Sequence, residues 1–337
     1  MNMSKLTIPA GYKMPLTNNE LQRAIELIHA DFQHNLTVRL NLHRVSAPLF
    51  VDGATGLNDD LNGVERPVTF DIPDVGTDGQ VVHSLAKWKR LALKRYEFKL
   101  GTGLYTDMNA IRRDEVVDNL HSIYVDQWDW EKHIDPQNRN VLYLKDTVRE
   151  IVGCICDTAT ALRNAFPVLT FRPDRDVYFI TTQELEDRFP NLTPNERELE
   201  ICRLHHTVFL MQIGKTLKSG SKHDGRAPDY DDWDLNGDIL MWNPVLGRNF
   251  EVSSMGIRVD AAALDRQLEE SGCNQRRNLP FHQMLLHGEL PQSIGGGIGQ
   301  SRLCMLLLGT CHIGEVQVSL WDQETLRACE KAGITLL

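Results

Sequence analysis

Residues 294–302 read Ile294-Gly295-Gly296-Gly297-Ile298-Gly299-Gln300-Ser301-Arg302, and the apolar residues 303–308 follow directly. Glycines let the backbone approach a ligand closely, and the start of a helix offers free N–H groups and a positive dipole end. A guanidinium held there suits a phosphate because its charge is permanent and its donors form a fork. The pattern predicts a tight glycine turn that delivers Arg302 into the first turn of a helix, facing a phosphate. An ordinary strand-to-helix turn, with Arg302 paired to a carboxylate, is the alternative.

Two other phosphate-binding motifs are excluded by their spacing. Gly214-Lys215-Thr216 resembles the end of a P-loop, but that motif needs a glycine where this chain has Phe209. A G-x-G-x-x-G that follows a strand and opens a βαβ unit is also missing from the sequence. A P-loop protein and a dinucleotide-binding fold are therefore not supported.

A second arginine stands between two strand-like segments. Residues 103–111 read as a strand, Arg112-Arg113-Asp114-Glu115 follows, and residues 120–131 alternate in the manner of another strand. The pattern is strand, Arg-x-Asp-Glu, polar loop, strand. It predicts that Arg112 lies at the end of a strand, beside a charged loop.

These segments resemble the motifs of class II aminoacyl-tRNA synthetases. The segment around Arg112 is similar to motif 2, and the glycine run that ends in Arg302 is similar to motif 3. Motif 1 has its counterpart in a helix-like stretch at 18–34, a strand-like stretch at 37–44 and Ala47-Pro48. Within that superfamily the chain resembles ammonia-dependent asparagine synthetase in six long blocks, at 82–90, 124–130, 226–233, 236–240, 253–258 and 295–303. The resemblance implies an α+β fold, a class II synthetase-like antiparallel sheet flanked by helices.

The chain is expected to comprise an N-terminal arm, residues 1–16, and a single class II synthetase-like catalytic domain, residues 17–337. The arm holds Pro9, Gly11 and Pro15 and reads as loose, whereas Thr17-x-x-Glu20 is a capping box that starts a helix. Residues 52–65 are rich in Gly, Asn and Asp and read as a mobile loop. The patterns predict further helices near 142–166, 182–188 and 196–204, and strands near 37–45, 177–180, 208–213, 238–242 and 250–259. Because the resemblance begins close to the N-terminus, we expect no anticodon-binding barrel before it.

Composition narrows the class of partner. The formal net charge of −10 argues against a nucleic-acid partner, which usually requires a basic surface. No apolar run reaches about 18 residues and the N-terminus has no apolar signal core, so we expect neither a membrane span nor secretion. The seven cysteines form no disulfide framework, which fits a reducing compartment and predicts a cytoplasmic protein.

The resemblance implies how ATP is held. Arg112 corresponds to the motif 2 arginine that bridges the α-phosphate and the attacking carboxylate, and Arg302 to the motif 3 arginine on the terminal phosphate. His121 lies in the motif 2-like loop, where it is expected to contact ATP. Asp238 and Glu251 correspond to the acidic pair that holds Mg²⁺ between phosphates, and carboxylates suit this hard cation. Without the resemblance, each would read as an ordinary exposed charge or ion pair.

The resemblance also implies an aspartate site. Ser84 and Lys89 lie in a block similar to the substrate-binding stretch of aspartyl-tRNA synthetase, where counterparts of Lys89 and Arg258 hold the side-chain carboxylate. Making asparagine requires activation of the β-carboxylate instead, so we expect these two cations to hold the α-carboxylate, with aspartate bound end for end.

Three acceptors, Gln127, Asp129 and Asp231, are expected to bind the substrate ammonium or the incoming ammonia. Asp59 lies in a segment similar to a lid and is expected to orient or deprotonate ammonium, because protonated ammonia cannot attack.

The sequence thus predicts a magnesium-dependent ligase that makes asparagine from aspartate, ATP and ammonia through β-aspartyl-AMP, as a homodimer. Glutamine is disfavoured as nitrogen donor, because residue 2 is Asn rather than Cys and a G-x-C-x-G elbow is missing. Two alternatives stay open: a synthetase-like module that senses aspartate or asparagine without turnover, and an enzyme that aminoacylates a carrier other than tRNA.

Overall fold

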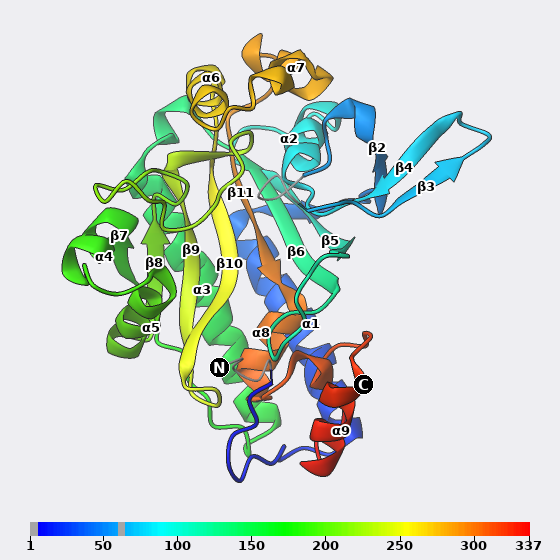
Figure 1. Ribbon diagram of the computed structural model, residues 1–337, viewed down its shortest axis with the longest axis vertical. Coiled ribbons are helices and arrows are strands. Elements are labelled where there is room, and N and C mark those ends of the chain that lie inside the picture. The colour runs from blue at the N-terminus through cyan, green and yellow to red at the C-terminus, as the bar shows by residue number, and fades with distance from the viewer. Residues whose placement is uncertain (1–5, 60–64) are drawn as a thin grey trace.

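The computed structural model describes residues 6–59 and 65–337, which are built around an eight-stranded sheet (Figure 1). The six central strands pair antiparallel with one another. At the two edges, β1 pairs parallel with β5 and β7 pairs parallel with β8. The predicted α+β class is confirmed, with the difference that the sheet is mixed rather than wholly antiparallel. In sheet order the strands are β1 Leu42–Arg44, β5 Gly103–Ile111, β6 Tyr124–His133, β11 Ser293–Gly299, β10 Arg248–Arg258, β9 Asp231–Asn243, β8 Thr207–Met211 and β7 Tyr178–Thr181.

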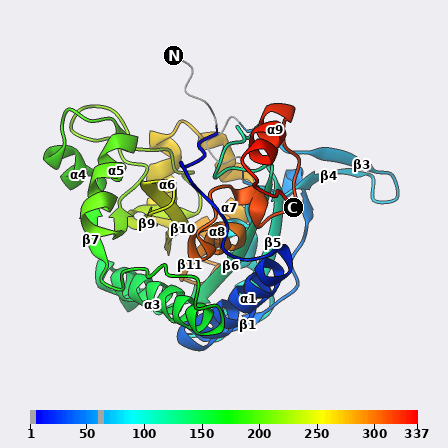
Figure 2. The ribbon, with the colours of Figure 1, turned by 90° about the horizontal axis from the view of Figure 1, so that it is seen from below.

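Two long helices, α1 Asn18–Leu40 and α3 Val141–Ala165, lie side by side on one face of this sheet (Figures 1 and 2). The predicted capping box starts α1, since Thr17 and Glu20 bond reciprocally. The prediction of a strand over 37–45 is wrong in its first half, because α1 continues to Leu40. Leu36 and Leu40 are buried in the core, and this packing outweighs the β-propensity of Thr37 and Val38.

The remaining elements are a small second sheet, seven shorter helices and four 3₁₀ turns in the described residues. A small sheet comprises β2 Phe50–Asp52, β4 Thr77–Val81 and β3 Thr69–Ile72, and its β3–β4 hairpin projects from the body in both ribbon views (Figures 1 and 2). Part of the predicted loop at 52–65 is thus strand and 3₁₀ helix, and residues 60–64 lie outside the described residues. The shorter helices are α2 Ala86–Arg95, α4 Thr182–Arg188, α5 Pro194–His205, α6 Ala261–Glu270, α7 Pro280–Leu286, α8 Gln300–Leu308 and α9 Gln323–Lys331, and the 3₁₀ turns are η1 Gly53–Thr55, η2 Pro136–Asn138, η3 Asn274–Asn278 and η4 Ile313–Glu315.

The glycine run is a strand, not the predicted turn. Residues 293–299 form β11, which pairs with β6 on one side and β10 on the other, and none of its glycines has a positive φ. Glycine is needed there for space: a Cβ at Gly296 would lie 2.5 Å from Met255 Cβ, and one at Gly297 would lie 2.4 Å from Gln127 Oε1. The other half of the prediction is confirmed, because α8 begins at Gln300 and carries Arg302 in its first turn.

The described part of the N-terminal arm is packed rather than loose. Leu6, Ile8 and Tyr12 contact an apolar cluster near the C-terminus, and the Tyr12 hydroxyl donates to Glu315 Oε2 at 2.8 Å. The division between arm and catalytic domain stays a prediction. Within the described ranges, every helix is too short or too polar to cross a bilayer.

Candidate active site

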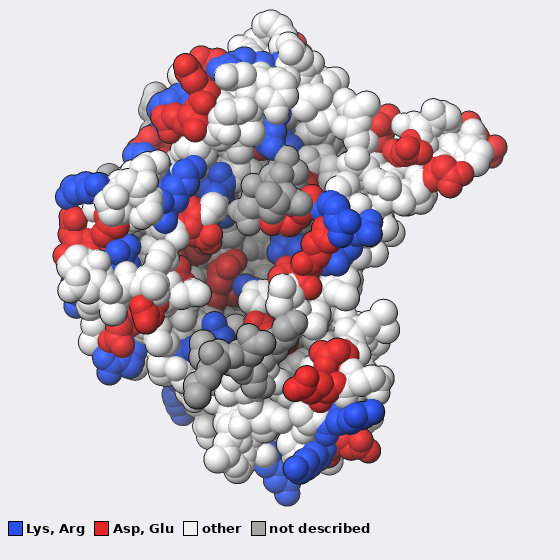
Figure 3. All heavy atoms as spheres, viewed as in Figure 1, with Lys and Arg blue, Asp and Glu red and all other residues white. Residues whose placement is uncertain are grey.

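A cavity of about 410 Å³ opens on the face of the sheet opposite α1 and α3, and acidic and basic side chains gather in this hollow (Figure 3). It is lined by every site residue predicted from the sequence, although these come from distant parts of the chain. Those residues are Asp59, Ser84, Lys89, Arg112, His121, Gln127, Asp129, Asp231, Asp238, Glu251, Arg258 and Arg302.

Strand β6 shows why the cavity is polar while the layer behind it is apolar. Side chains alternate between the two faces of a strand. Trp128 and Trp130 are fully buried in the core beside α1, where Phe32 lies 4.7 Å from Trp128 between ring centroids. Gln127 and Asp129, on the opposite face, therefore line the cavity.

Lys89 and Asp129 form a buried ion pair at one end of the cavity. The Lys89 ammonium also donates to the carbonyl of Gly296 at 3.0 Å. Burial lowers the pKa of Lys89 and raises that of Asp129, and in each case the partner charge opposes the shift. Among the described residues, Asp129 Oδ2 is buried without a hydrogen-bond partner. An acceptor is therefore free at the point where the sequence predicted a contact to ammonium.

Arg258 is held by two carboxylates at the same end. Its Nη2 lies 2.7 Å from Glu131 Oε2, its Nε lies 3.0 Å from Glu131 Oε1, and its Nη1 pairs with Asp231. Ser293 Oγ donates to the same Glu131 carboxylate at 2.7 Å. Burial alone would raise the pKa of Glu131, but the Arg258 guanidinium, the Lys89 ammonium and the Ser293 hydroxyl together outweigh burial and hold that pKa below its ordinary value.

Sequence reasoning missed Glu131. The signal was present, because Gln127, Asp129 and Glu131 are spaced by two and therefore share one face of a strand. Buried charges need partners, and Arg258 is the partner that Glu131 requires.

The ion-pair network around Lys89 and Arg258 carries an excess of one negative charge. Lys89 and Arg258 face three carboxylates, those of Asp129, Asp231 and Glu131. Such a set suits a zwitterionic ligand, with the cations on its carboxylate and the spare acceptors on its ammonium. Ser84, also at the cavity wall, accepts from the backbone N–H of Ala86 at 3.1 Å and so fixes the start of α2.

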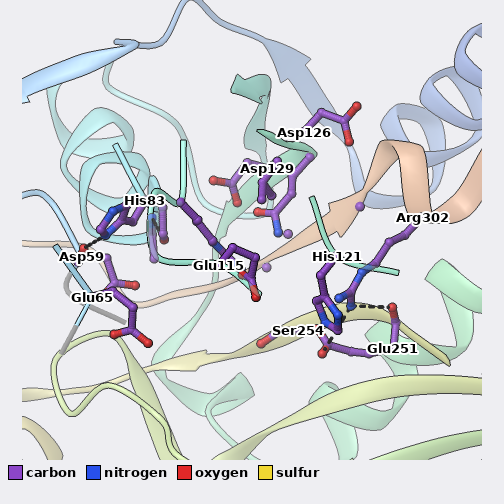
Figure 4. A pocket seen from close by; sticks show the side chains of 18 of the residues that line it. Asp59, Glu65, His83, Glu115, His121, Asp126, Asp129, Glu251, Ser254 and Arg302 are labelled. Carbon is purple, nitrogen blue, oxygen red and sulfur yellow. Dashed lines mark hydrogen bonds and ion pairs between the residues drawn. The ribbon is translucent and has the colours of Figure 1, made fainter. Parts of the chain in front are cut away.

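The other end of the cavity carries Arg302, Glu251 and His121 (Figure 4). Arg302 Nη1 donates to the Glu251 carbonyl at 3.0 Å and lies 3.5 Å from Glu251 Oε2. The ring of His121 is fixed by Asp118, whose Oδ1 lies 2.9 Å from His121 Nδ1. Arg112 lines the same region, and within the described part of the chain its Nε is buried without a hydrogen-bond partner.

Asp238 and Glu251 come from adjacent strands, β9 and β10, and influence each other. Burial and the Glu251 carboxylate raise the pKa of Asp238 to about 7, against the opposing effect of Arg226, whose Nη2 donates to Asp238 at 2.6 Å. Arg226 was not predicted from the sequence. Crowded carboxylates of this kind fit Mg²⁺, which binds through one or two carboxylates together with substrate phosphates. The described residues contain no cluster of three or more metal-ligating side chains, so a cation here would depend on the phosphates.

Asp59 lies at the end of the cavity away from Arg302, next to His83 (Figure 4). Its backbone carbonyl lies 3.0 Å from His83 Nδ1, and its side chain is buried. Asp59 is the last described residue before 60–64, so the predicted lid extends beyond the described residues.

Solved structures with the same architecture define the class of fold. Asparaginyl-tRNA synthetase from Pyrococcus horikoshii, complexed with asparaginyl-adenylate, matches with a TM-score of 0.66 at 13% identity, over 90% of this chain and 70% of that one. The Entamoeba histolytica asparaginyl-tRNA synthetase, also in complex with asparaginyl-adenylate, gives a TM-score of 0.63 at 14% identity, over 92% of this chain and 71% of that one. The fold is that of class II aminoacyl-tRNA synthetases.

Sequence comparison then identifies the family. A family model described as aspartate-ammonia ligase matches residues 19–333. The aspartate–ammonia ligase of Clostridium perfringens is 56% identical over 338 aligned positions, covering 99% of this chain and 100% of that protein. That of Lactobacillus johnsonii is 57% identical over 334 positions, covering 98% of this chain and 99% of that protein. This chain belongs to the aspartate–ammonia ligase family, and the family predicted from its sequence is confirmed.

Proposed function

We propose that this chain makes L-asparagine from L-aspartate and ammonia, using ATP and releasing AMP and pyrophosphate. One observation carries the proposal: a single cavity joins a charge set suited to a zwitterionic amino acid with an arginine-rich end suited to a triphosphate. The family supports this activity over the two alternatives, since the relatives just described are named for it.

In the first step, an oxygen of the β-carboxylate attacks the α-phosphorus of ATP, and pyrophosphate leaves. Two anions must be brought together, so positioning and electrostatic stabilisation supply most of the rate. Arg112 would bridge the attacking carboxylate and the α-phosphate, and Arg302 would hold the terminal phosphate. Asp238 and Glu251 would hold Mg²⁺, which neutralises charge on the phosphates when it is bound.

Aspartate is oriented by the charges at the end of the cavity that carries Lys89 and Arg258. Lys89 and Arg258 hold the α-carboxylate, and Asp231 and Asp129 accept from the α-ammonium. The β-carboxylate then faces Arg112. The binding is end for end compared with an enzyme that activates the α-carboxylate.

In the second step, the nitrogen of ammonia attacks the β-carbonyl carbon of β-aspartyl-AMP, and AMP leaves with the oxygen that came from the carboxylate. Most ammonia is protonated near neutral pH and cannot attack until it loses a proton. Gln127 would accept from the incoming nitrogen, and Asp59 would take up or direct its proton.

We further propose a homodimeric, cytoplasmic enzyme. Val38, in the segment similar to motif 1, is 66% exposed, and Leu49, directly after that segment, is 54% exposed, which supports a partner subunit on this surface. All seven cysteines lie in the described part of the chain and are free thiols, which supports a reducing compartment.

The test is to supply ATP, aspartate and Mg²⁺ with either ammonium or glutamine and to measure AMP and asparagine. We expect both products in equal amounts with ammonium, and little asparagine with glutamine. A sensing module would bind ligands without making AMP. An enzyme that charges a carrier would make AMP only when a carrier is added.

A further inference from the structure

The loop that joins β5 to β6, residues 112–123, carries both Arg112 and His121 into the cavity. The tip of this loop is held in place by hydrogen bonds to one of its own residues, Asp118. Asp118 Oδ1 accepts from the backbone N–H groups of Leu120 and His121 at 2.7 and 2.8 Å, in addition to contacting the His121 ring. The position of His121 therefore depends on the position of this tip.

Asn119, at the tip of the loop, connects it to both ends of the chain. Its side-chain Nδ2 donates to the carbonyls of Thr7 and Cys311 at 2.8 and 2.7 Å, and its Oδ1 accepts from the Thr7 N–H at 2.7 Å. Its own carbonyl accepts from the Ile313 N–H at 2.8 Å. Only 4% of Asn119 is exposed, and its bond to Cys311 is buried, whereas its two bonds to the exposed Thr7 are partly buried.

The N-terminal strap, residues 6–12, is in turn fixed to the segment after α8. The Tyr12 hydroxyl donates to Glu315 Oε2, while Glu315 Oε1 accepts from the N–H groups of Cys311 and His312 at 2.9 and 3.0 Å. Ile313, in the same segment, itself lines the cavity. The strap, the segment 311–315 and Asn119 form one hydrogen-bonded unit behind the β5–β6 loop.

We propose that the N-terminal strap is a positioning element for nucleotide binding, and that Asn119 transmits its position to Arg112 and His121. This inference rests on the proposed function, in which these two residues contact ATP. The aspartate end is built from α2, β6, β9 and β10, whereas Thr7 and Tyr12 of the strap bond to Asn119 and Glu315. Loosening the strap should therefore raise the KM for ATP and leave the KM for aspartate nearly unchanged.

Position 7 offers a matched pair of variants. Thr7 contributes its backbone N–H and carbonyl to Asn119, not its side chain. Thr7→Pro removes the N–H donor, whereas Thr7→Ala keeps both backbone groups. Loss of one partly buried hydrogen bond corresponds to a change of up to about five-fold, so we expect the KM for ATP to rise by up to about five-fold in Thr7→Pro. The KM for aspartate should stay within about two-fold, and Thr7→Ala should match the wild type in both constants.

Asn119→Ala extends the test, with Asn243→Ala as its control. Asn243 is also buried, and it accepts from the N–H groups of Val245 and Leu246 in the β9–β10 turn, away from the loop. We expect Asn119→Ala to raise the KM for ATP by about ten-fold or more, because it removes three hydrogen bonds. Asn243→Ala should lower thermal stability without changing the ratio of the KM for ATP to the KM for aspartate.

Amide hydrogen exchange on the full-length protein without substrates supplies a readout independent of turnover. Thr7→Pro should speed exchange in peptides that cover 112–123 and leave those from β9 and β10 unchanged. The proposal would be overturned if Thr7→Pro matched Thr7→Ala in exchange and in the KM for ATP, or if both KM values rose equally. Failure of the wild type to make asparagine would instead count against the proposed function, while the exchange result would still test the strap.

Discussion

Gly295 of β11 lies directly opposite Glu131 of β6, and a Cβ atom at Gly295 would come within 2.0 Å of Glu131 Oε2. The same Cβ would lie 2.6 Å from Arg258 Nη2. The missing side chain thus makes room for the ion pair that orients Arg258 at the proposed aspartate site. A feature that reads in the sequence as a phosphate-binding turn contributes to the amino-acid end of the cavity instead.

Gly295→Ala should displace the Glu131 carboxylate and misalign Arg258. We expect the KM for aspartate to rise at least about ten-fold, equivalent to the loss of about 1.4 kcal/mol of binding, with the KM for ATP within about two-fold. Gly153→Ala is the control, since Gly153 lies within α3 and its nearest neighbour would be the flexible Arg39 side chain, 3.3 Å away. Steady-state kinetics decide the matter, and an unchanged KM for aspartate in Gly295→Ala would contradict this role of Glu131.

Glu131→Gln should destabilise the fold in a pH-dependent way. Removing one partner of a buried pair typically costs about 3 kcal/mol, so we expect a loss of that order at pH 7. The folded-state pKa of Glu131 is held below its value of about 4.3 in the unfolded chain, so the pair stabilises the fold above that pH and less as the pH falls through the folded-state pKa.

Urea unfolding from pH 7 downward measures the difference in the free energy of unfolding between Glu131→Gln and the wild type. It should stay constant to about pH 5 and narrow below about pH 4.3. Glu289→Gln is the control, since Glu289 pairs with Lys94 on the surface and should contribute less than about 1 kcal/mol. A difference that widened as the pH fell would reverse the sign expected for Glu131.

The sequence predicted some helices and strands correctly and others wrongly. Local sequence patterns predicted α3, α4 and α5 to within about two residues, because the signals that form a helix lie within its own segment. Local sequence patterns gave a wrong prediction at residues 37–40, because core packing extends α1 through β-branched residues. They also gave a wrong prediction at Gly295–Gly299, because glycine is required there by the close approach of the neighbouring strands. The spacing of Glu131 places it on the cavity face of its strand, but the partners of Glu131 and Arg226 are 127 and 12 residues away, and only the folded chain brings each pair together.

Asp238→Asn and Glu251→Gln should each raise the Mg²⁺ concentration needed for half-maximal activity by about ten-fold, because each removes a charged oxygen ligand. Mn²⁺ binding in the presence of a non-hydrolysable ATP analogue, followed by electron paramagnetic resonance, gives a readout that does not need turnover. Asp234→Asn, at a partly exposed residue that pairs with Lys215, is the control. If neither site variant altered the metal titration, the acidic pair would have no part in metal binding.

Arg302→Ala should weaken ATP use while leaving the fold intact. The hydrogen bond and the ion pair of the Arg302 side chain are both made to Glu251, and this side chain is partly exposed, so little stability depends on it. We expect kcat/KM for ATP to fall at least about ten-fold through loss of a charge-assisted contact, with the melting temperature within about 2 °C. Arg302→Lys should recover only part of the activity, since lysine lacks the forked donors. Wild-type kcat/KM in the alanine variant would rule out the phosphate role.

The central claim is that the β-carboxylate of aspartate is activated by transfer of AMP. Aspartate carrying ¹⁸O in both oxygens of the β-carboxylate tests it most directly, with mass spectrometry of all products. The account predicts one ¹⁸O atom in each AMP, one in each asparagine and none in pyrophosphate, whereas label in the α-carboxylate stays wholly in asparagine. Label appearing in AMP from the α-carboxylate, or in phosphate rather than AMP, would contradict the account.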